Sequence, residues 1–157
     1  MNQQSKDSLM PKNNFKFSQR SIDNLKGVNG ELVEVCHLAL SLSDIDFGVS
    51  EGLRTLEQQK EYVAQGKSQT LNSKHLSGDA IDVYAYVDGS VSWDVKYYIK
   101  IAEAFRQAAK QKECAIRWGG SWTVLNSEPS ASVAYNDYID ERRDPFIDAP
   151  HFEIIKD

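Results

Sequence analysis

Two long segments carry apolar residues at the three- and four-residue spacing of an amphipathic helix. The first covers about residues 30–43 and the second covers residues 94–112. Each segment has one apolar face of the kind that packs against a core. Two shorter helices are also expected, one around Ile22 and Leu25 and one from Thr55 through Ala64 with Gly66 as its C-terminal stop.

Short runs of β-branched and aromatic residues lie between the helices and predict strands. These runs cover residues 47–53, 80–86, 115–118 and 151–155. Residues 67–79 are rich in Ser, Asn, Gly and Lys, which predicts a loop. The helices alternate with short strands, and we expect some of these strands to be antiparallel. Together with the lack of an internal repeat, this pattern predicts a single small α+β domain.

Two parts of the chain fall outside this pattern. Residues 1–14 are polar and are expected to form a flexible tail, so that the domain covers residues 15–157. Residues 123–147 show no clear period and are rich in charged side chains. We interpret this segment as a surface loop or short helix, with a lid or a wall of the substrate cleft as the functional hypothesis.

Composition narrows the function classes. The 157 residues are 41% hydrophobic and 26% charged, and their formal net charge is -5. Such a chain is long enough to bury a core, and its scattered Lys and Arg argue against a nucleic-acid-binding protein. No apolar run is long enough for a membrane span or a signal peptide, so we expect synthesis in the cytoplasm and no stable membrane association. Cys36 and Cys114 lie in apolar contexts and are interpreted as packing groups, with a disulfide as the alternative.

The unusual polar residues gather in three segments, at residues 51–55, 73–82 and 148–153. In the second segment Asp82 lies inside an apolar strand, where a carboxylate is costly to bury unless it is paired or bound to a metal. His75 precedes it in the loop, and His151 opens the last strand. Two imidazoles and one carboxylate form the ligand set of a catalytic zinc with an open fourth position.

Two further residues would complete a hydrolytic site. Asp148, three residues before His151, would accept a proton from the attacking water and pass it to the leaving amine. Arg54, at the end of a strand, would polarise the attacked carbonyl. Each spacing is unspecific by itself, since a histidine near a turn is usually structural, as we interpret His37. From the residues alone, a purely structural role for His75 with Asp82, and for Asp148 with His151, remains an alternative.

The order of the motifs resembles the M15 zinc peptidases. The resemblance rests on Ser73-x-His75-x-x-Gly78-x-Ala80-x-Asp82, on Trp118-Gly119-Gly120-x-Trp122 and on Asp148-x-Pro150-His151-Phe152. The upstream run Glu51-Gly52-x-Arg54-Thr55-x-x-x-Gln59, with Gly66-x-Ser68, is similar to the phage endolysin branch. The resemblance covers roughly residues 17–155. Compact relatives have a shorter segment after the position of Trp122, so residues 123–147 are interpreted as an extra segment.

The resemblance implies a role for each matching residue. His75, Asp82 and His151 match the ligands of one zinc ion per chain. Asp148 matches the catalytic carboxylate, and Arg54 matches the arginine that binds the substrate carbonyl. Ser68 and Ser73 match positions that line the substrate cleft, and we expect the stretch from Trp118 to Trp122 to form one wall of it. The family fold is a small α+β domain whose antiparallel sheet carries the zinc, with helices packed outside.

The implied function is that of a monomeric endolysin that hydrolyses the L-Ala–D-Glu bond of peptidoglycan stem peptides and lyses the host cell. It would act on the wall after a holin releases it from the host cytoplasm. A D-Ala-D-Ala carboxypeptidase is the related alternative, with Arg142 or Arg143 as the cation for a terminal carboxylate. A non-catalytic zinc-binding or wall-binding module is the alternative from a different class, and retention of Asp148 argues against it.

Overall fold

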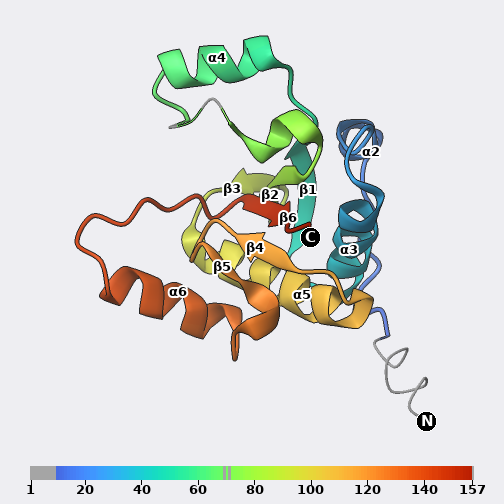
Figure 1. Cartoon of the computed structure of the whole chain (residues 1–157). Coiled ribbons are helices and arrows are strands. Elements are labelled where there is room, and N and C mark those ends of the chain that lie inside the picture. Colours follow the sequence, from blue (N-terminus) through green and yellow to red (C-terminus); the bar gives the residue numbers. More distant parts are fainter. Residues whose placement is uncertain (1–9, 69, 71, 157) are drawn as a thin grey trace.

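The computed structural model describes residues 10–68, 70 and 72–156, and within them six strands form one antiparallel sheet (Figure 1). The strands are β1 (Asp46–Glu51), β2 (Ala80–Val87), β3 (Ser90–Ser92), β4 (Ile116–Trp118), β5 (Thr123–Val124) and β6 (His151–Ile154). Their order is β1-β2-β6-β4-β5, and β3 pairs with β2. The last strand therefore lies in the middle of the sheet, which brings the C-terminal motif beside β2.

The helices of the described residues begin at side-chain caps that the sequence provides. They are α2 (Gln19–Asn24), α3 (Gly30–Leu42), α4 (Leu56–Ala64), α5 (Val95–Lys112) and α6 (Ala131–Asp140), with short 3-10 turns η1 (Lys74–Ser77) and η2 (Leu125–Ser127). Asn29 caps α3 and Asp94 caps α5, while Thr55 and Gln58 form a reciprocal capping box at α4. The two long predicted helices are confirmed, and so is the α+β class.

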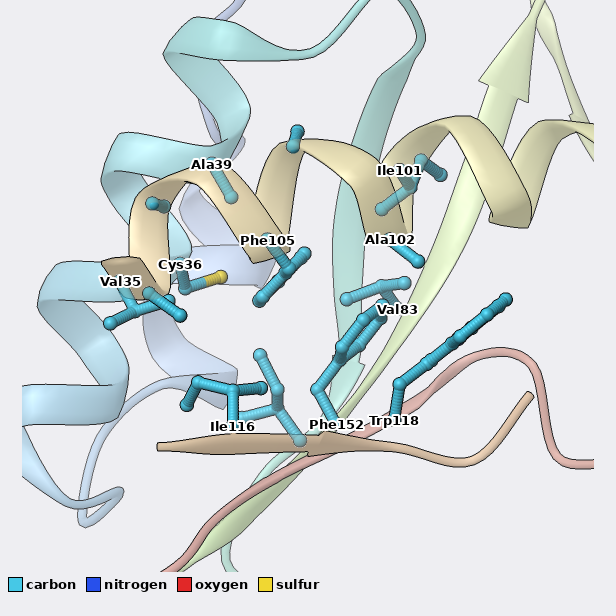
Figure 2. Close-up of a cluster of buried hydrophobic side chains, with 14 of the residues drawn as sticks. Val35, Cys36, Ala39, Val83, Ile101, Ala102, Phe105, Ile116, Trp118 and Phe152 are labelled. Carbon is cyan, nitrogen blue, oxygen red and sulfur yellow. The ribbon is translucent and has the colours of Figure 1, made fainter. Parts of the chain in front are cut away.

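The core lies between one face of the sheet and helices α3 and α5 (Figure 2). The rings of Phe105 from α5 and Phe152 from β6 stack with centroids 3.9 Å apart, and Trp118 from β4 packs beside Phe152. Each such buried ring contributes about 1.5–3 kcal/mol of hydrophobic stabilisation. Along β2, Ile81 and Val83 are fully buried. Because side chains alternate along a strand, Asp82 between them faces away from this core.

The chain joins the domain before the predicted boundary at Phe15. Residues 1–9 of the predicted tail lie outside the described residues. The backbone N–H of Lys12 donates to the carbonyl of Ser41 at 2.7 Å. The side-chain amide of Asn13 donates to the carbonyls of Leu40 and Ser43. These bonds tie residues 12 and 13 to the C-terminal end of α3.

The segment 123–147 is a packed part of the domain. It contains β5, η2 and α6, and the side chains of Leu125 and Ala131 are fully buried. Helix α6 buries few residues, mainly alanines, which explains why the sequence showed no period there. The segment is thus built around a short helix. The hydroxyl of Tyr138 donates to the carbonyl of Phe146 at 2.8 Å, and this bond links α6 to the end of the segment.

The structure bears on the two cysteines and on the possibility of a membrane-spanning helix. Cys36 and Cys114 are both buried and free, so the interpretation as packing groups is confirmed and the disulfide alternative is wrong. Within the same residues, none of the helices combines the length and the apolar character that crossing a membrane requires.

Candidate active site

Strand register collects the polar side chains on the open face of the sheet. Asp82 of β2 pairs with His151 of β6 on one side. On the other side the register between β1 and β2 shifts after Val49, so that Glu51 pairs with Asp82. A bulge of this kind re-aims side chains and is common beside active sites. Asp82 therefore lies between an imidazole and a second carboxylate.

His75 is held by the 3-10 turn that leads into β2. Ser73 caps this turn by accepting the backbone N–H of His75, and Gly78 ends it in the left-handed conformation with φ of 76°. The imidazole is 2% exposed, and its Nδ1 lies 2.8 Å from the carbonyl oxygen of Gly52. Since a carbonyl only accepts hydrogen bonds, Nδ1 carries the proton and Nε2 points at Asp82, 3.2 Å from its Oδ1.

His151 opens β6 and is fixed from the other side by Glu153. The two residues lie on the same face of the strand, and Nε2 of His151 lies 2.8 Å from Oε1 of Glu153. The other ring nitrogen, Nδ1, lies 3.2 Å from Oδ1 of Asp82. The remaining oxygen of Glu153 faces Arg117 at 3.3 Å and Lys74 at 3.8 Å. Glu153 thus orients the ring that Asp82 faces.

These three side chains could hold a metal ion. One ligand atom from each of His75, Asp82 and His151 lies within 4.8 Å of the others. Each imidazole bonds an outer partner through its second nitrogen, which leaves the inner nitrogen to face the shared carboxylate. Such outer hydrogen bonds are typical of metal-binding histidines, because they fix ring orientation and tautomer. The donor set of two nitrogens and one oxygen fits a divalent metal such as zinc.

The charges of these side chains depend on one another. Burial by itself would raise the pKa of Asp82, but hydrogen bonds from His151 and His75 outweigh it and lower the pKa well below the usual range. Burial would lower the pKa of His151, but its bonds to Asp82 and Glu153 raise the pKa to about 10. In the metal-free protein the group therefore holds a proton on His151 that a metal must displace.

Asp148 enters the site from the turn before β6. Its backbone N–H donates to the carbonyl of Gly119 at 2.9 Å, and its carbonyl accepts the N–H of His151 at 3.0 Å. A side chain on Gly119 would meet the carbonyl oxygen of Asp148 at 2.2 Å, so the close approach requires glycine. Burial, followed by the charge of Asp82, raises the pKa of Asp148. A carboxyl with a raised pKa is suited to both accept and donate a proton.

Arg54 comes from the loop between β1 and α4 and is only 7% exposed. Glu51 accepts hydrogen bonds from its Nε and its terminal nitrogen, and the amide oxygen of Gln59 accepts another. The guanidinium also lies over the ring of Tyr62, 4.6 Å from its centroid. One of its nitrogens is 3.7 Å from Asp82. A guanidinium bound on three sides keeps one geometry and presents a fixed positive charge to the cavity.

A cavity of about 760 Å³ opens onto these groups. Its volume is typical of a ligand site. The predicted residues on its walls are Arg54, Ser68, Ser73, His75, Asp82, Trp122, Asp148 and His151. Eight of the nine predicted site residues therefore meet at one cavity.

Trp118 is the exception, and its predicted place in the cleft is wrong. The ring is fully buried in the core and packs beside Phe152 and Tyr135. Its indole N–H donates to the carbonyl of Ala149 at 2.7 Å. From the core side, Trp118 thus supports the turn that carries Asp148. Strand alternation explains the error, because β4 directs Ile116 and Trp118 to the core and Arg117 to the other face.

Several residues of the site were not predicted from the sequence. Glu51, Tyr62, Phe146 and Glu153 line the cavity, and Gln59 bonds Arg54 from behind. Two of them had a usable signal. Glu153 follows His151 by two residues on a strand and so shares its face. Gln59 belongs to the upstream motif, and it is the buried residue of α4.

Trp122 and Phe146 form an aromatic wall of the cavity. Their rings stack with centroids 6.0 Å apart, and the indole N–H of Trp122 donates to the carbonyl of Phe146 at 3.0 Å. Trp122 has a positive φ of 54°, which is unusual for a residue with a side chain and common at functional sites. The wall is therefore built from both ends of the segment that contains α6.

Comparison with known proteins gives a consistent result. A family model described as phage L-alanyl-D-glutamate peptidase matches residues 13–155. The L-alanyl-D-glutamate peptidase of Escherichia phage T5 is 34% identical over 145 residues, which cover 90% of this chain and 98% of that protein. The L-alanyl-D-glutamate peptidase of Listeria phage A118 is 34% identical over 125 residues, covering 78% of this chain and 43% of that protein.

A solved structure shares the fold. The crystal structure of Serratia marcescens L-Ala D-Glu endopeptidase ChiX is 40% identical, with a TM-score of 0.70, and the match covers 89% of this chain and 90% of that one. The resemblance to the endolysin branch is thereby confirmed. The match of the family model to nearly the whole chain, together with the phage relatives, shows that this chain belongs to the phage L-alanyl-D-glutamate peptidase family.

Proposed function

We propose that the protein is a zinc-dependent endolysin that hydrolyses the L-Ala–D-Glu bond of peptidoglycan stem peptides. One observation carries this proposal: in a chain of this peptidase family, a buried His75–Asp82–His151 group opens onto the same cavity as Asp148 and Arg54. One zinc ion per chain would be held by these three ligands. When bound, zinc supplies a Lewis acid that makes a water molecule acidic enough to attack near neutral pH.

Asp148 serves as the proton carrier of the reaction. Its raised pKa allows the carboxylate to accept a proton from the attacking water and to donate it to the leaving amine of D-Glu. Gly119 and the backbone bond between Asp148 and His151 fix its place beside the metal ligands. The carboxylate of Asp148 lines the cavity but is not needed as a ligand, which argues against a non-catalytic zinc or wall-binding module.

Arg54 binds the carbonyl oxygen of L-Ala and stabilises the negative charge that develops there. Electrostatic stabilisation of this kind depends on groups that are already oriented before the reaction. Glu51, Gln59 and Tyr62 provide that orientation. Arg54 therefore acts on the acyl half of the substrate, whereas Asp148 acts on the amine half.

Residues on two walls of the cavity would contact the substrate. Ser68 and Ser73 offer hydroxyl groups on one wall, and Trp122 with Phe146 offers an aromatic surface on another. Residues 123–147 contribute to this second wall through Phe146, which favours a role for the segment as a wall of the cleft rather than a lid. We propose that the enzyme works as a monomer on the wall after holin-type release from the host cytoplasm.

The D-Ala-D-Ala carboxypeptidase alternative loses the cations suggested for it. Arg142 lies over the ring of Tyr138, and neither Arg142 nor Arg143 lines the cavity. Mass spectrometry of muropeptides digested by the purified enzyme tests the assignment. Release of a free peptide that begins with D-Glu supports the endopeptidase, whereas loss of a terminal D-Ala alone would overturn it.

A further inference from the structure

We infer that Lys74 recognises the free α-carboxylate of the D-Glu residue and so selects D-Glu over its amide, D-isoglutamine. The inference rests on the proposed function and concerns its substrate specificity. In the stem peptide, D-Glu continues through its γ-carboxyl group. Its α-carboxylate therefore stays free, on the carbon that carries the nitrogen of the scissile bond. An enzyme that cuts this bond must place a negative charge very close to its own acidic residues.

Lys74 is placed to receive that charge. It precedes the metal ligand His75 in η1, and its side chain lines the cavity. Its ammonium lies 3.8 Å from Glu153, whose other oxygen bonds His151. At that distance the pair with Glu153 is an ion pair without a short hydrogen bond. The side chain is 40% exposed, so the ammonium keeps hydrogens for a ligand that enters from the cavity.

The other cations near the site are less suited. Arg54 already bonds Glu51 and Gln59 and is nearly buried. Arg117 reaches Glu153 but does not line the cavity. Lys67 lines the cavity from the side of α4, where its ammonium lies 5.9 Å from the centre of the Tyr62 ring.

The direction of the substrate favours Lys74 over Lys67. In the proposed reaction Arg54 contacts the carbonyl of L-Ala, and Asp148 protonates the nitrogen of D-Glu. Asp148 belongs to the turn before β6, and Lys74 reaches β6 through Glu153. The D-Glu half therefore lies over the β6 side of the cavity, where Lys74 is. Lys67 lies beside Tyr62 and Arg54, on the acyl side.

The size of the effect follows from the charge and the exposure of Lys74. A hydrogen bond between charged groups favours D-Glu over D-isoglutamine by about tenfold or more in kcat/KM. Because Lys74 is partly exposed, added salt should reduce this preference. A lysine that only supports Glu153 would instead affect both substrates equally.

The test compares two defined muropeptides that differ only in D-Glu or D-isoglutamine, with full-length zinc-loaded enzyme. The ratio of the two kcat/KM values is measured for wild type, Lys74→Gln, Lys74→Arg and Lys67→Gln. We expect wild type, Lys74→Arg and Lys67→Gln to prefer D-Glu, and Lys74→Gln to lose most of the preference. Zinc content and thermal unfolding of each variant are measured alongside.

The outcomes separate this inference from the proposed function. Cleavage of both muropeptides at equal rates by wild type, or an unchanged ratio in folded Lys74→Gln, would overturn the role of Lys74 while leaving the endopeptidase activity in place. Loss of the preference in Lys67→Gln rather than Lys74→Gln would also overturn it. Failure of wild type to cleave either muropeptide at L-Ala would instead reject the proposed function.

Discussion

Replacing Gly119 with alanine should displace the carboxylate of Asp148 without changing any charged residue. The new methyl group would lie 2.2 Å from the carbonyl oxygen of Asp148 and 3.0 Å from its carbonyl carbon. To restore an ordinary van der Waals contact, the backbone at Asp148 must retreat by about 1 Å. Two hydrogen bonds resist this movement, because Gly119 bonds Asp148 through its carbonyl and His151 through its N–H.

The expected magnitude has two parts. Overpacking of this kind typically costs about 1–3 kcal/mol in the free energy of unfolding. A misplacement of about 1 Å at a reacting group lowers the rate by about 10²-fold. We therefore expect Gly119→Ala to fold with a lower melting temperature and to lose about 10²-fold in kcat/KM.

The assay measures muropeptide cleavage, thermal unfolding and zinc content on the same preparation. Gly30→Ala is the matched control, since a side chain at Gly30 would meet nothing within 4 Å. It lies in the first turn of α3, and it should keep full activity. The reasoning would be refuted if Gly119→Ala kept wild-type kcat/KM, or if Gly30→Ala lost as much activity as Gly119→Ala.

Three other predictions follow from the site and the core. Asp148→Asn should keep its zinc and its fold but lose about 10²–10⁴-fold in kcat, because an amide cannot carry the proton; lysis at the wild-type rate would contradict this role. The raised pKa of His151, about 10, means that zinc displaces a proton, so zinc affinity should fall about tenfold for each pH unit below that value. Calorimetry in buffers of different ionisation enthalpy measures this release, and binding without proton release would be inconsistent with it. Cys36→Ser and Cys114→Ser should each lower the melting temperature while preserving kcat/KM, since both thiols are buried and free; inactivation by mild reductant would contradict this.

The sequence predicted the three side chains that the structure gathers into a group able to hold a metal, because their chemistry is visible locally. A carboxylate at position 82 between Ile81 and Val83 is hard to explain without a partner, and the motif order supplied the two histidines. The alternation of β2 then placed Asp82 on the face away from the core, as the structure shows. Local patterns were sufficient here because each ligand lies in or beside a regular strand.

The rest of the site depends on contacts that sequence patterns do not contain. The bulge after Val49 brings Glu51 opposite Asp82, and no local pattern specifies that register. Gln59 reaches Arg54 only because α4 folds back behind the arginine. Trp118 was misplaced because Trp122 of the same motif lines the cleft, whereas strand alternation turns the ring of Trp118 into the core. Tertiary packing, rather than local preference, decides these positions.

The most direct test of the whole account is a zinc titration of the metal-stripped enzyme on a defined muropeptide. We expect no cleavage without metal, a linear gain in release of the peptide that begins with D-Glu, and saturation at one zinc per chain. His151→Ala should show no gain at the same zinc concentrations, because it lacks one of the three ligands. Full activity of the stripped enzyme, or a wild-type titration curve for His151→Ala, would contradict the account.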